Sequence, residues 1–228
     1  MPSEPRTHKT APVRDLARVG PQGTCFYFGT FNPIHAGHLM IAQAALCQYG
    51  ESLGVQGITF IPAGNPPHRE HESDMMPARH RLNMVRLATA SNPAFRVSDI
   101  ELCRSGRSYT MDTLRFLLEQ GIAQAPIPMI IGADALAGLA TWHEPQALAE
   151  TACFLQAPRP GHPFVGAIQV NGQEITLNTR EIEMPPLSIS STWIRARLRE
   201  NPPGCERLRY FLPEPVRQYI RDNRLYDA

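Results

Sequence analysis

Short apolar runs alternate with helical stretches along most of this 228-residue chain. Runs of about five apolar residues fit buried strands, and the stretches between them begin or end at proline and glycine. The predicted strands are Thr24–Phe28, Gly57–Ile61, Phe95–Leu102, Pro128–Ile131, Cys153–Gln156 and Thr179–Met184. The predicted helices are Leu39–Tyr49, Pro77–Ala90, Thr110–Gln120, Asp134–Thr141, Pro145–Glu150, Ser190–Glu200 and Glu214–Asn223. Such alternation predicts an α/β fold with a doubly wound parallel sheet, covered on both faces.

The first 22 residues differ in composition from the rest. They mix proline, arginine, histidine and threonine with few large apolar side chains. This composition predicts a mobile N-terminal tail, with a short helix over Val13–Val19 as the alternative. Residues 23–228 are predicted to form a single domain whose C-terminal part, about 188–228, is helical.

Composition excludes several classes of partner. The net charge of +1 gives no field for nucleic acid or a membrane surface. No apolar run approaches the roughly 18 residues of a membrane span, and the N-terminus lacks the apolar core of a secretory signal. The five cysteines are scattered without a CxxC pair, as is typical of thiols kept reduced. We expect a cytoplasmic protein with no nucleic-acid or membrane partner; a homo-oligomer remains open.

The stretch "GTFNPIHAGH" (residues 29–38) follows the first predicted strand. It contains neither a GxGxxG fingerprint nor a Walker loop. A helix that begins near Ala36–Gly37 nevertheless offers free N–H groups and the positive end of its dipole to an anion. His35 and His38 are three residues apart and lie on one side of that turn. Together with the hydroxyl of Thr30, they predict a cradle for phosphate oxygens.

Two other interpretations of this stretch stay open from the residues alone. Asn32 and Pro33 can form a simple turn that leaves both histidines in solvent. A zinc site is the second alternative, although no third ligand stands at a usable spacing.

A second helix start carries hydroxyls in "ISSTWIR". Ser190 or Ser191 is a good N-cap for the helix that follows. Arg195 follows Ser191 at i+4 and can lie on the same side. On its own this pattern is also typical of a capped surface helix with ordinary arginines. Two such helix starts at one sheet edge would instead form a polyphosphate clamp.

Both stretches resemble the signatures of the nucleotidyltransferase superfamily, which transfers an adenylyl or cytidylyl group from a nucleoside triphosphate. "GTFNPIHAGHL" is similar to the first signature, and "ISSTWIR" supplies the Ser-x-Thr-x-x-Arg of the second. Between and after them, "IPAGNPPHR", "SYTMDTL", "IIGADALAGLATWHEPQAL", "RPG" and "LPEPVRQYIRDNRLY" resemble the bacterial nicotinate mononucleotide adenylyltransferases. The resemblance spans roughly residues 24–226. Asn32 departs from the aspartate of many relatives, but both residues cap turns.

The resemblance implies a Rossmann-like nucleotidyltransferase fold and a direct in-line reaction. The phosphate of nicotinate mononucleotide would attack the α-phosphorus of ATP, giving deamido-NAD and pyrophosphate. Such a reaction needs no covalent enzyme intermediate, so catalysis rests on positioning and charge neutralisation. His35, His38 and Arg195 are the expected catalytic residues. Mg²⁺ is expected to bind through the ATP phosphates, with no metal ligands from the protein.

The resemblance also assigns the expected binding residues. Those expected to bind ATP are Gly29, Thr30, Phe31, His35, Gly37, His38, Gly132, Asp134, Arg159, Ser190, Ser191, Thr192 and Arg195. Those expected to bind the acceptor are Asn65, His68, Arg69, Tyr109, Thr110, Trp142 and His143. Several have plainer alternatives. Asp134 can be a helix cap, Arg159 a loop arginine, Tyr109 a packing residue and Trp142 a core residue.

Two further functions stay open. The same chemistry could serve nicotinamide mononucleotide or phosphopantetheine, or the fold could be a non-catalytic ATP-binding sensor. A sensor could lose His35, His38 and Arg195, whereas this chain retains all three. Pyrophosphate release from ATP plus acceptor would separate the enzyme from the sensor.

Overall fold

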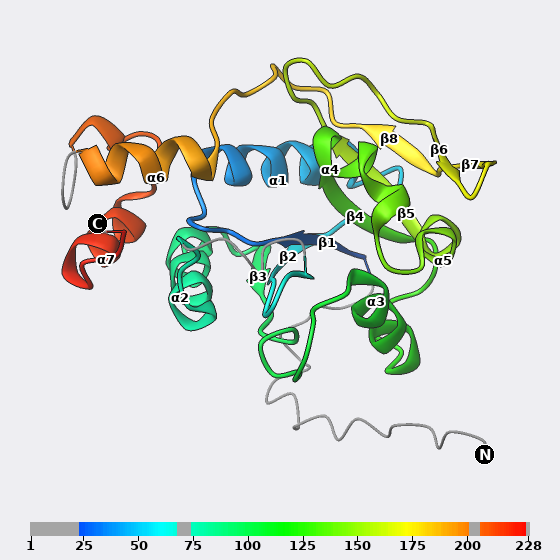
Figure 1. Cartoon of the computed structure of the whole chain (residues 1–228), viewed down its shortest axis with the longest axis horizontal. Coiled ribbons are helices and arrows are strands. Elements are labelled where there is room, and N and C mark those ends of the chain that lie inside the picture. Colours follow the sequence, from blue (N-terminus) through cyan, green and yellow to red (C-terminus); the bar gives the residue numbers. More distant parts are fainter. Residues whose placement is uncertain (1–22, 68–73, 201–205, 227–228) are drawn as a thin grey trace.

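A six-stranded parallel sheet forms the centre of the protein (Figure 1). The computed structural model describes residues 23–67, 74–200 and 206–226, so the predicted tail at 1–22 lies outside the described residues. The strands are β1 (Thr24–Gly29), β2 (Gly57–Pro62), β3 (Phe95–Val97), β4 (Ile127–Gly132), β5 (Ala152–Ala157) and β8 (Thr179–Glu181). Their order across the sheet is β3-β2-β1-β4-β5-β8, and every pairing is parallel. The predicted doubly wound α/β fold is confirmed.

Helices connect the strands and follow the sheet. They are α1 (Ala36–Tyr49), α2 (Ala78–Thr89), α3 (Thr110–Glu119), α4 (Ala133–Ala137), α5 (Pro145–Thr151), α6 (Ser191–Glu200) and α7 (Glu214–Asp222). Two short 3-10 turns, Leu139–Thr141 and Glu206–Leu208, accompany them. The described residues after position 188 are therefore largely helical, as expected. Within the described ranges, no helix is both long and apolar enough to cross a membrane.

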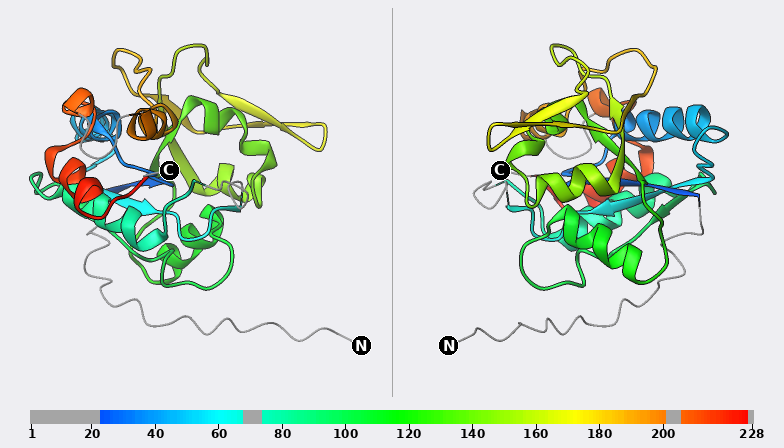
Figure 2. Two further views of the ribbon diagram at one scale, coloured as in Figure 1. Left: turned by 60° about the vertical axis from the view of Figure 1, so that its left-hand side comes forward. Right: turned by 90° about the vertical axis from the view of Figure 1, so that its right-hand side faces the viewer.

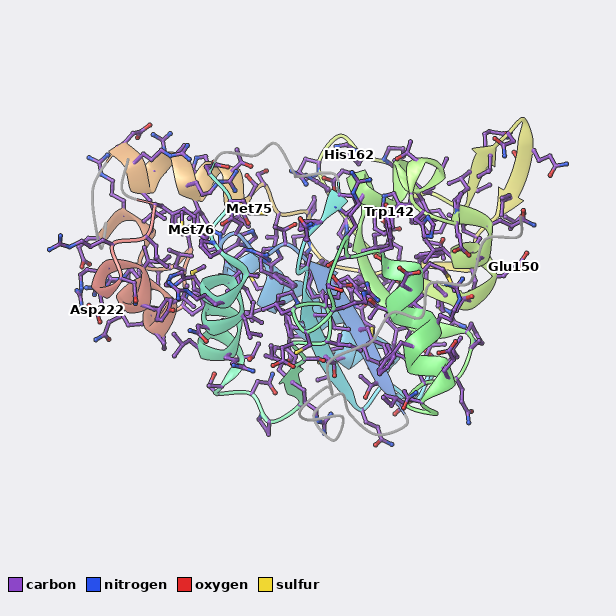
Figure 3. The ribbon with its side chains drawn as sticks, turned by 60° about the horizontal axis from the view of Figure 1, so that its bottom comes forward. Met75, Met76, Trp142, Glu150, His162 and Asp222 are labelled. Carbon is purple, nitrogen blue, oxygen red and sulfur yellow. The ribbon has the colours of Figure 1, made fainter. Side chains whose placement is uncertain are left out.

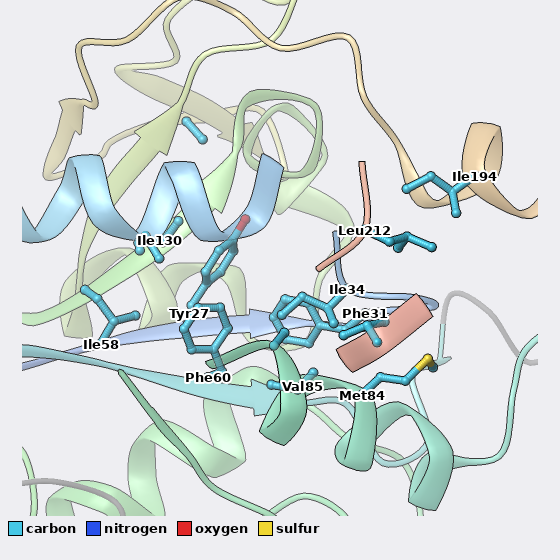
Figure 4. Packing of buried hydrophobic residues seen from close by; sticks show 14 of the residues in the cluster. Tyr27, Phe31, Ile34, Ile58, Phe60, Met84, Val85, Ile130, Ile194 and Leu212 are labelled. Carbon is cyan, nitrogen blue, oxygen red and sulfur yellow. The ribbon is translucent and has the colours of Figure 1, made fainter. Parts of the chain in front are cut away.

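Side chains of the central strands β1, β2, β4 and β5 enter two different apolar clusters, one on each face of the sheet. On β1, Tyr27 belongs to the first cluster, which it shares with α1, α2, α6 and α7 (Figure 4). Its neighbour Phe26 belongs to the second cluster, with α3, α4 and α5. Strands buried on both faces explain why the sequence shows continuous apolar runs rather than alternation. Ile194 of α6 and Val216 of α7 tie the C-terminal helices to the first cluster.

The strand order reverses between β1 and β4. From β1 the chain moves outward through β2 to β3, and then crosses back to β4 on the other side of β1. In such sheets the carboxyl ends of the two central strands diverge into a crevice that takes the ligand. The stretch at residues 29–38 follows β1 directly and therefore lies at this crevice.

Three predicted elements were too long. The strand expected over Phe95–Leu102 ends at Val97, because the chain turns at Ser98, whose Oγ accepts from the Ile100 N–H. The strand expected over Thr179–Met184 ends at Glu181, the last residue that pairs with β5. The helix expected over Asp134–Thr141 is divided at Gly138 into α4 and a 3-10 turn.

A hairpin of β6 (Ala167–Val170) and β7 (Gln173–Thr176) was missed and projects from the body of the protein (Figure 2). Its turn is Asn171–Gly172, and both residues have positive φ, 51° and 80°. Asn-Gly is the strongest short-range signal for a hairpin of this kind. The hairpin could therefore have been predicted from this Asn-Gly pair in the sequence.

Candidate active site

Two cavities open at the carboxyl edge of the sheet and meet at the end of β1. The first has a volume of about 320 Å³ and the second about 460 Å³. Gly29 and Thr30 line both of them, and so do Phe28, Asp134 and Ala135. Two ligands held in the two cavities would therefore face each other across the last residues of β1.

The first cavity gathers nearly all the residues expected to bind ATP. They are Gly29, Thr30, Phe31, His35, Gly37, His38, Gly132, Asp134, Arg159, Ser190, Ser191 and Thr192. These residues lie at the ends of three strands and at the starts of two helices. The fold brings them together although they are spread over more than half of the chain. The grouping supports their predicted role, which stays a prediction until a ligand is bound.

His35 and His38 stack on each other at the start of α1. Their ring centroids are 3.7 Å apart and the rings are inclined by 28°. His35 is the N-cap of the helix, and its main-chain N–H donates to Nδ1 of His38 at 3.1 Å. A neutral His38 therefore carries its proton on Nε2 and can donate from that atom.

Burial holds both imidazoles in the neutral form. Burial, together with the charge of Arg159, lowers the pKa of His35 to about 3. Burial and the neighbouring His35 lower the pKa of His38 well below its usual value. Near neutral pH the pair therefore offers neutral N–H groups rather than imidazolium charge. Nδ1 of His35 is buried and has no hydrogen-bond partner among the described residues.

Glycine at position 37 is required by close packing. A Cβ on Gly37 would lie 2.6 Å from a methyl carbon of Ile189 and 3.1 Å from Nδ1 of His35. The segment before α6 therefore packs directly on the first turn of α1. A side chain here would push the two helix starts apart.

The start of α6 bears hydroxyls, as the second signature predicts. Ser190 is the N-cap residue, since its Oγ accepts from the Trp193 N–H at 3.2 Å. The Ser191 hydroxyl instead donates to the Pro33 carbonyl at 2.8 Å. This hydrogen bond joins the second signature to the first.

Arg195 lies beneath the first cavity rather than on its wall. Its side chain is buried; Nε binds Asp74 at 2.7 Å, and Nη1 donates to the carbonyl of Asn32 at 2.9 Å. Partial burial raises the pKa of Asp74, but hydrogen bonds and charges from Arg195 and Arg199 bring it below its usual value. The structure thus shows Arg195 holding the loop of the first signature, and its contact with the triphosphate stays a prediction.

Asn32 is the centre of a hydrogen-bond network that the sequence did not reveal. Its Oδ1 accepts from the Tyr226 hydroxyl at 2.8 Å and from the Met76 N–H at 3.2 Å. Its Nδ2 donates to the carbonyl of Asp74 at 3.2 Å. An asparagine uses both its donor and its acceptor here, which an aspartate could not do.

Asp134 and Arg159 form an ion pair on the wall of the first cavity, with Nη1 2.5 Å from Oδ2. Asp134 follows β4 in the first turn of α4, and Arg159 follows β5. Both side chains are partly exposed, so the pair itself contributes little to stability. Its position on the cavity wall agrees with the expected role of both residues beside ATP.

The second cavity gathers four residues expected to bind the acceptor: Tyr109, Thr110, Trp142 and His143. Tyr109 stacks on His143 with ring centroids 4.3 Å apart. Trp142 also packs against the second apolar cluster, and Figure 3 labels it beside the carboxyl edge of the sheet. Its position fits both the core and the binding interpretation, and binding of the acceptor stays a prediction.

Asn65, the fifth expected acceptor residue that the structure describes, does not line the cavity. Asn65 is exposed next to the lining residue Pro66, and its main-chain N–H and carbonyl both bond to Ser108. His68 and Arg69 lie outside the described residues. Their predicted contacts with the acceptor phosphate stay predictions.

Glu101 is a buried carboxyl group in the second cavity that sequence reasoning missed. Burial raises its pKa, against hydrogen bonds from the Thr113 and Ser108 hydroxyls and from the Gly64 N–H. Glu101 follows the turn that ends β3, where the sequence had predicted a continuing strand. Its role depends on contacts far along the chain, for which no local pattern exists.

Metal-ligating groups are sparse near these cavities. Asp112, His143 and Glu144 come close enough to hold an ion, but Arg115 already forms ion pairs with both carboxylates. The first cavity offers imidazoles, hydroxyls and amides, together with the arginine-paired Asp134. Such a donor set suits phosphate oxygens rather than a cation cage.

Comparison with known proteins places this geometry in a family. The cytidylyltransferase-like family matches residues 26–197. A protein of Symbiobacterium thermophilum named probable nicotinate-nucleotide adenylyltransferase is 39% identical over 214 residues, covering 92% of this chain and 96% of its own. A protein of Moorella thermoacetica with the same name is 38% identical over 213 residues, covering 92% and 91%.

Solved structures show the same fold. The nicotinic acid mononucleotide adenylyltransferase of Plasmodium falciparum, complexed with NaAD, matches with a TM-score of 0.69 at 18% identity, over 91% of this chain and 98% of its own. The same enzyme complexed with APC matches with a TM-score of 0.66. These likenesses confirm the predicted nucleotidyltransferase fold, and the relatives with 38–39% identity confirm the predicted family. The chain belongs to the cytidylyltransferase-like family and, within it, to the nicotinate-nucleotide adenylyltransferases.

Proposed function

We propose that this enzyme transfers the adenylyl group of ATP to nicotinate mononucleotide, giving deamido-NAD and pyrophosphate in NAD biosynthesis. One observation carries the proposal: two cavities, one lined by histidines and hydroxyls and the other by aromatic side chains, share the wall formed by Gly29 and Thr30. That arrangement suits a reaction between two separately bound substrates. The names of the bacterial relatives support the same assignment.

The chemistry needs no general base from the protein. The 5′-phosphate of the acceptor is mostly ionised near neutral pH and can attack the α-phosphorus directly. The enzyme then contributes alignment and donors for the charge that builds on the phosphate oxygens. His38 can donate from Nε2, and the His35 ring lines the same cavity beside it.

Mg²⁺ is the expected cofactor. Since the first cavity holds few free oxygen ligands, the ion would bind mainly to the ATP phosphates and water, as small hard cations commonly do. It would neutralise charge on the triphosphate. The protein would hold the resulting complex through its helix starts and imidazoles.

The acceptor cavity favours a flat ring with an acidic substituent. Trp142 provides an aromatic surface, and the first turn of α3 offers the hydroxyl and N–H of Thr110. The Glu101 carboxyl in the same cavity already accepts from Thr113, Ser108 and Gly64, so the donors of Thr110 favour a carboxylate over a carboxamide. Nicotinate mononucleotide is therefore expected to exceed nicotinamide mononucleotide by at least about tenfold in kcat/KM, within the range of hydrogen-bond discrimination.

The proposal also includes a cytoplasmic location. The described cysteines, Cys25, Cys47, Cys103 and Cys153, are free thiols, in agreement with a reducing cytoplasm. A homo-oligomer is compatible with the exposed Met40 and Tyr210, but these residues select no partner surface.

An acceptor panel tests the function. Purified enzyme is incubated with ATP, Mg²⁺ and one acceptor at a time, and pyrophosphate release is followed. The proposal expects rapid release with nicotinate mononucleotide. Equal kcat/KM for both pyridine mononucleotides would remove the acid selectivity only. Turnover with phosphopantetheine alone would replace the acceptor, and ATP binding without turnover on any acceptor would indicate a sensor.

A further inference from the structure

Arg81 is a buried arginine that belongs to neither signature. It lies in the first turn of α2 with 1% of its surface exposed. Its guanidinium donates to three main-chain carbonyls: Nε to Met76 at 3.0 Å, Nη1 to Thr30 at 2.8 Å, and Nη2 to Gly64 at 3.1 Å. One side chain thus binds three segments of the chain, and Figure 3 shows Met76 where α2 begins.

Two of these carbonyls lie on or beside the cavity walls. Thr30 lies on the wall that the cavities share, directly after β1. Gly64 follows β2 and lies in the loop whose neighbours Ala63 and Pro66 line the acceptor cavity. Arg81 therefore joins the loop beside ATP to the loop beside the acceptor, without lining either cavity.

The acceptor loop is held from its other side as well. The N–H of Gly64 donates to the buried carboxylate of Glu101, and the N–H of Asn65 donates to Ser108 Oγ at 2.9 Å. A Cβ on Gly64 would lie 2.3 Å from the main-chain oxygen of Glu101. The loop thus sits tightly between Glu101 and Arg81, and a shift at either side chain would move it.

Only arginine can make this three-way link. Its planar guanidinium presents donors in fixed directions, whereas a lysine ammonium is a single point on a flexible stem. Burying a cation is costly unless it is fully hydrogen-bonded. In the described part of the chain its partners are carbonyls, whose positions it fixes. These contacts suit a side chain that fixes the positions of main-chain segments rather than one that forms a simple ion pair.

We propose that Arg81 is a positioning residue for adenylyl transfer, which sets the distance between the ATP loop at Thr30 and the acceptor loop at Gly64. The inference rests on the proposed function, since it concerns the alignment of two bound substrates. In-line transfer requires the reacting atoms at near-contact distance, and a displacement of about 1 Å can cost on the order of 10² in rate.

The test compares Arg81→Lys with the wild type. We expect kcat to fall at least tenfold, while KM for ATP and for nicotinate mononucleotide stays within threefold. Each loop can still bind its own substrate, but the distance between the two bound substrates is no longer fixed. Calorimetric Kd values for ATP alone and for the mononucleotide alone should likewise stay within threefold. Arg81→Gln, which keeps fewer donors and no charge, should lower kcat further.

Arg217→Lys is the matched control. Arg217 is equally a helical arginine, 5% exposed, and its ion pairs with Glu206 and Glu214 involve no residue that lines either cavity. Its replacement should lower the melting temperature and leave kcat within twofold. All variants are assayed well below their own melting temperatures.

Several results would overturn the proposal. One is a folded Arg81→Lys that keeps kcat within threefold. Another is a loss of ATP affinity that accounts for the lost rate, and a third is an equal loss of kcat in Arg217→Lys. Failure of both Arg81 variants to fold would make Arg81 a determinant of the fold instead. Wild-type enzyme that releases no pyrophosphate with any acceptor would refute the proposed function itself, and the two failures are thereby distinguished.

Discussion

At the scale of single residues, His38 is the imidazole best placed to act on the reaction. Its proton is directed to Nε2 by the His35 main-chain N–H, and its ring borders the first cavity. His38→Ala should lower kcat by about 10² to 10³, the usual cost of losing one such donor. The melting temperature should fall by only about 2–4 °C, because the change also removes one hydrogen bond, from the His35 N–H to Nδ1, worth about 1 kcal/mol.

Steady-state pyrophosphate release with a parallel thermal melt checks this prediction. Met40→Ala is the control, because Met40 lies on the same helix with 51% of its surface exposed. A kcat within threefold of wild type for His38→Ala would assign the imidazole a structural role.

Trp142 tests the acceptor cavity at the same scale. Trp142→Ala removes the aromatic surface beside Thr110 and should raise KM for nicotinate mononucleotide at least tenfold. The Kd for ATP should stay within threefold, because Trp142 lines only the second cavity. Trp193→Ala is the matched control, since Trp193 is the other tryptophan and packs against Phe211 on the outer surface of α6. Equal effects on both substrates would place the acceptor elsewhere.

At the scale of elements, the end of the described chain supports the first signature loop. Tyr226→Phe removes the hydroxyl that donates to Asn32 and should destabilise the protein by about 1 kcal/mol, the typical worth of such a hydrogen bond. The loop should also become more mobile, so KM for ATP should rise severalfold. Urea denaturation and ATP kinetics measure the two effects. Tyr210→Phe, at an 87% exposed position, should change neither.

The helices and strands also show which parts of the fold and of the site could be predicted from the sequence. The strands β1, β2, β4 and β5 were identified because their apolar runs are buried on both faces, and the helix starts at residues 36 and 191 follow from local signals. Asp74, Arg81, Glu101 and Tyr226 were missed. Each acts through partners that lie distant in the sequence, such as the 51 residues between Arg81 and Thr30. No periodicity or capping rule specifies such a pair, since only the folded chain brings its members together.

At the scale of the whole molecule, the neutral histidine pair makes stability depend on pH. The pKa of His35 falls from 6.5 in the unfolded chain to about 3 in the folded protein, and that of His38 falls well below 6.5. Below pH 6.5 the unfolded state therefore binds more protons, and the free energy of unfolding decreases as pH falls. Each group contributes up to about 1.4 kcal/mol per pH unit in that range.

Urea denaturation at pH 7.5 and 5.5 measures this dependence. Glu101, with its raised pKa, acts in the opposite direction, because its folded state binds the proton more tightly than the unfolded chain does. A His35→Gln, His38→Gln double variant should lose most of the dependence. A double variant that keeps the full pH dependence of the wild type would show that the histidine pair is not its source.

The loop at residues 30–34 is made early in synthesis and receives its supports late. Pro33 is held by Ser191 across 158 residues, Asn32 by Arg195 across 163, and Asn32 again by Tyr226 across 194. A nascent chain that has released all six strands from the ribosome still lacks every one of these contacts. We therefore expect the nascent chain to bind no ATP, although the nucleotide surrounds it in the cell. Binding would begin only once its last helices have been made and have folded onto the loop.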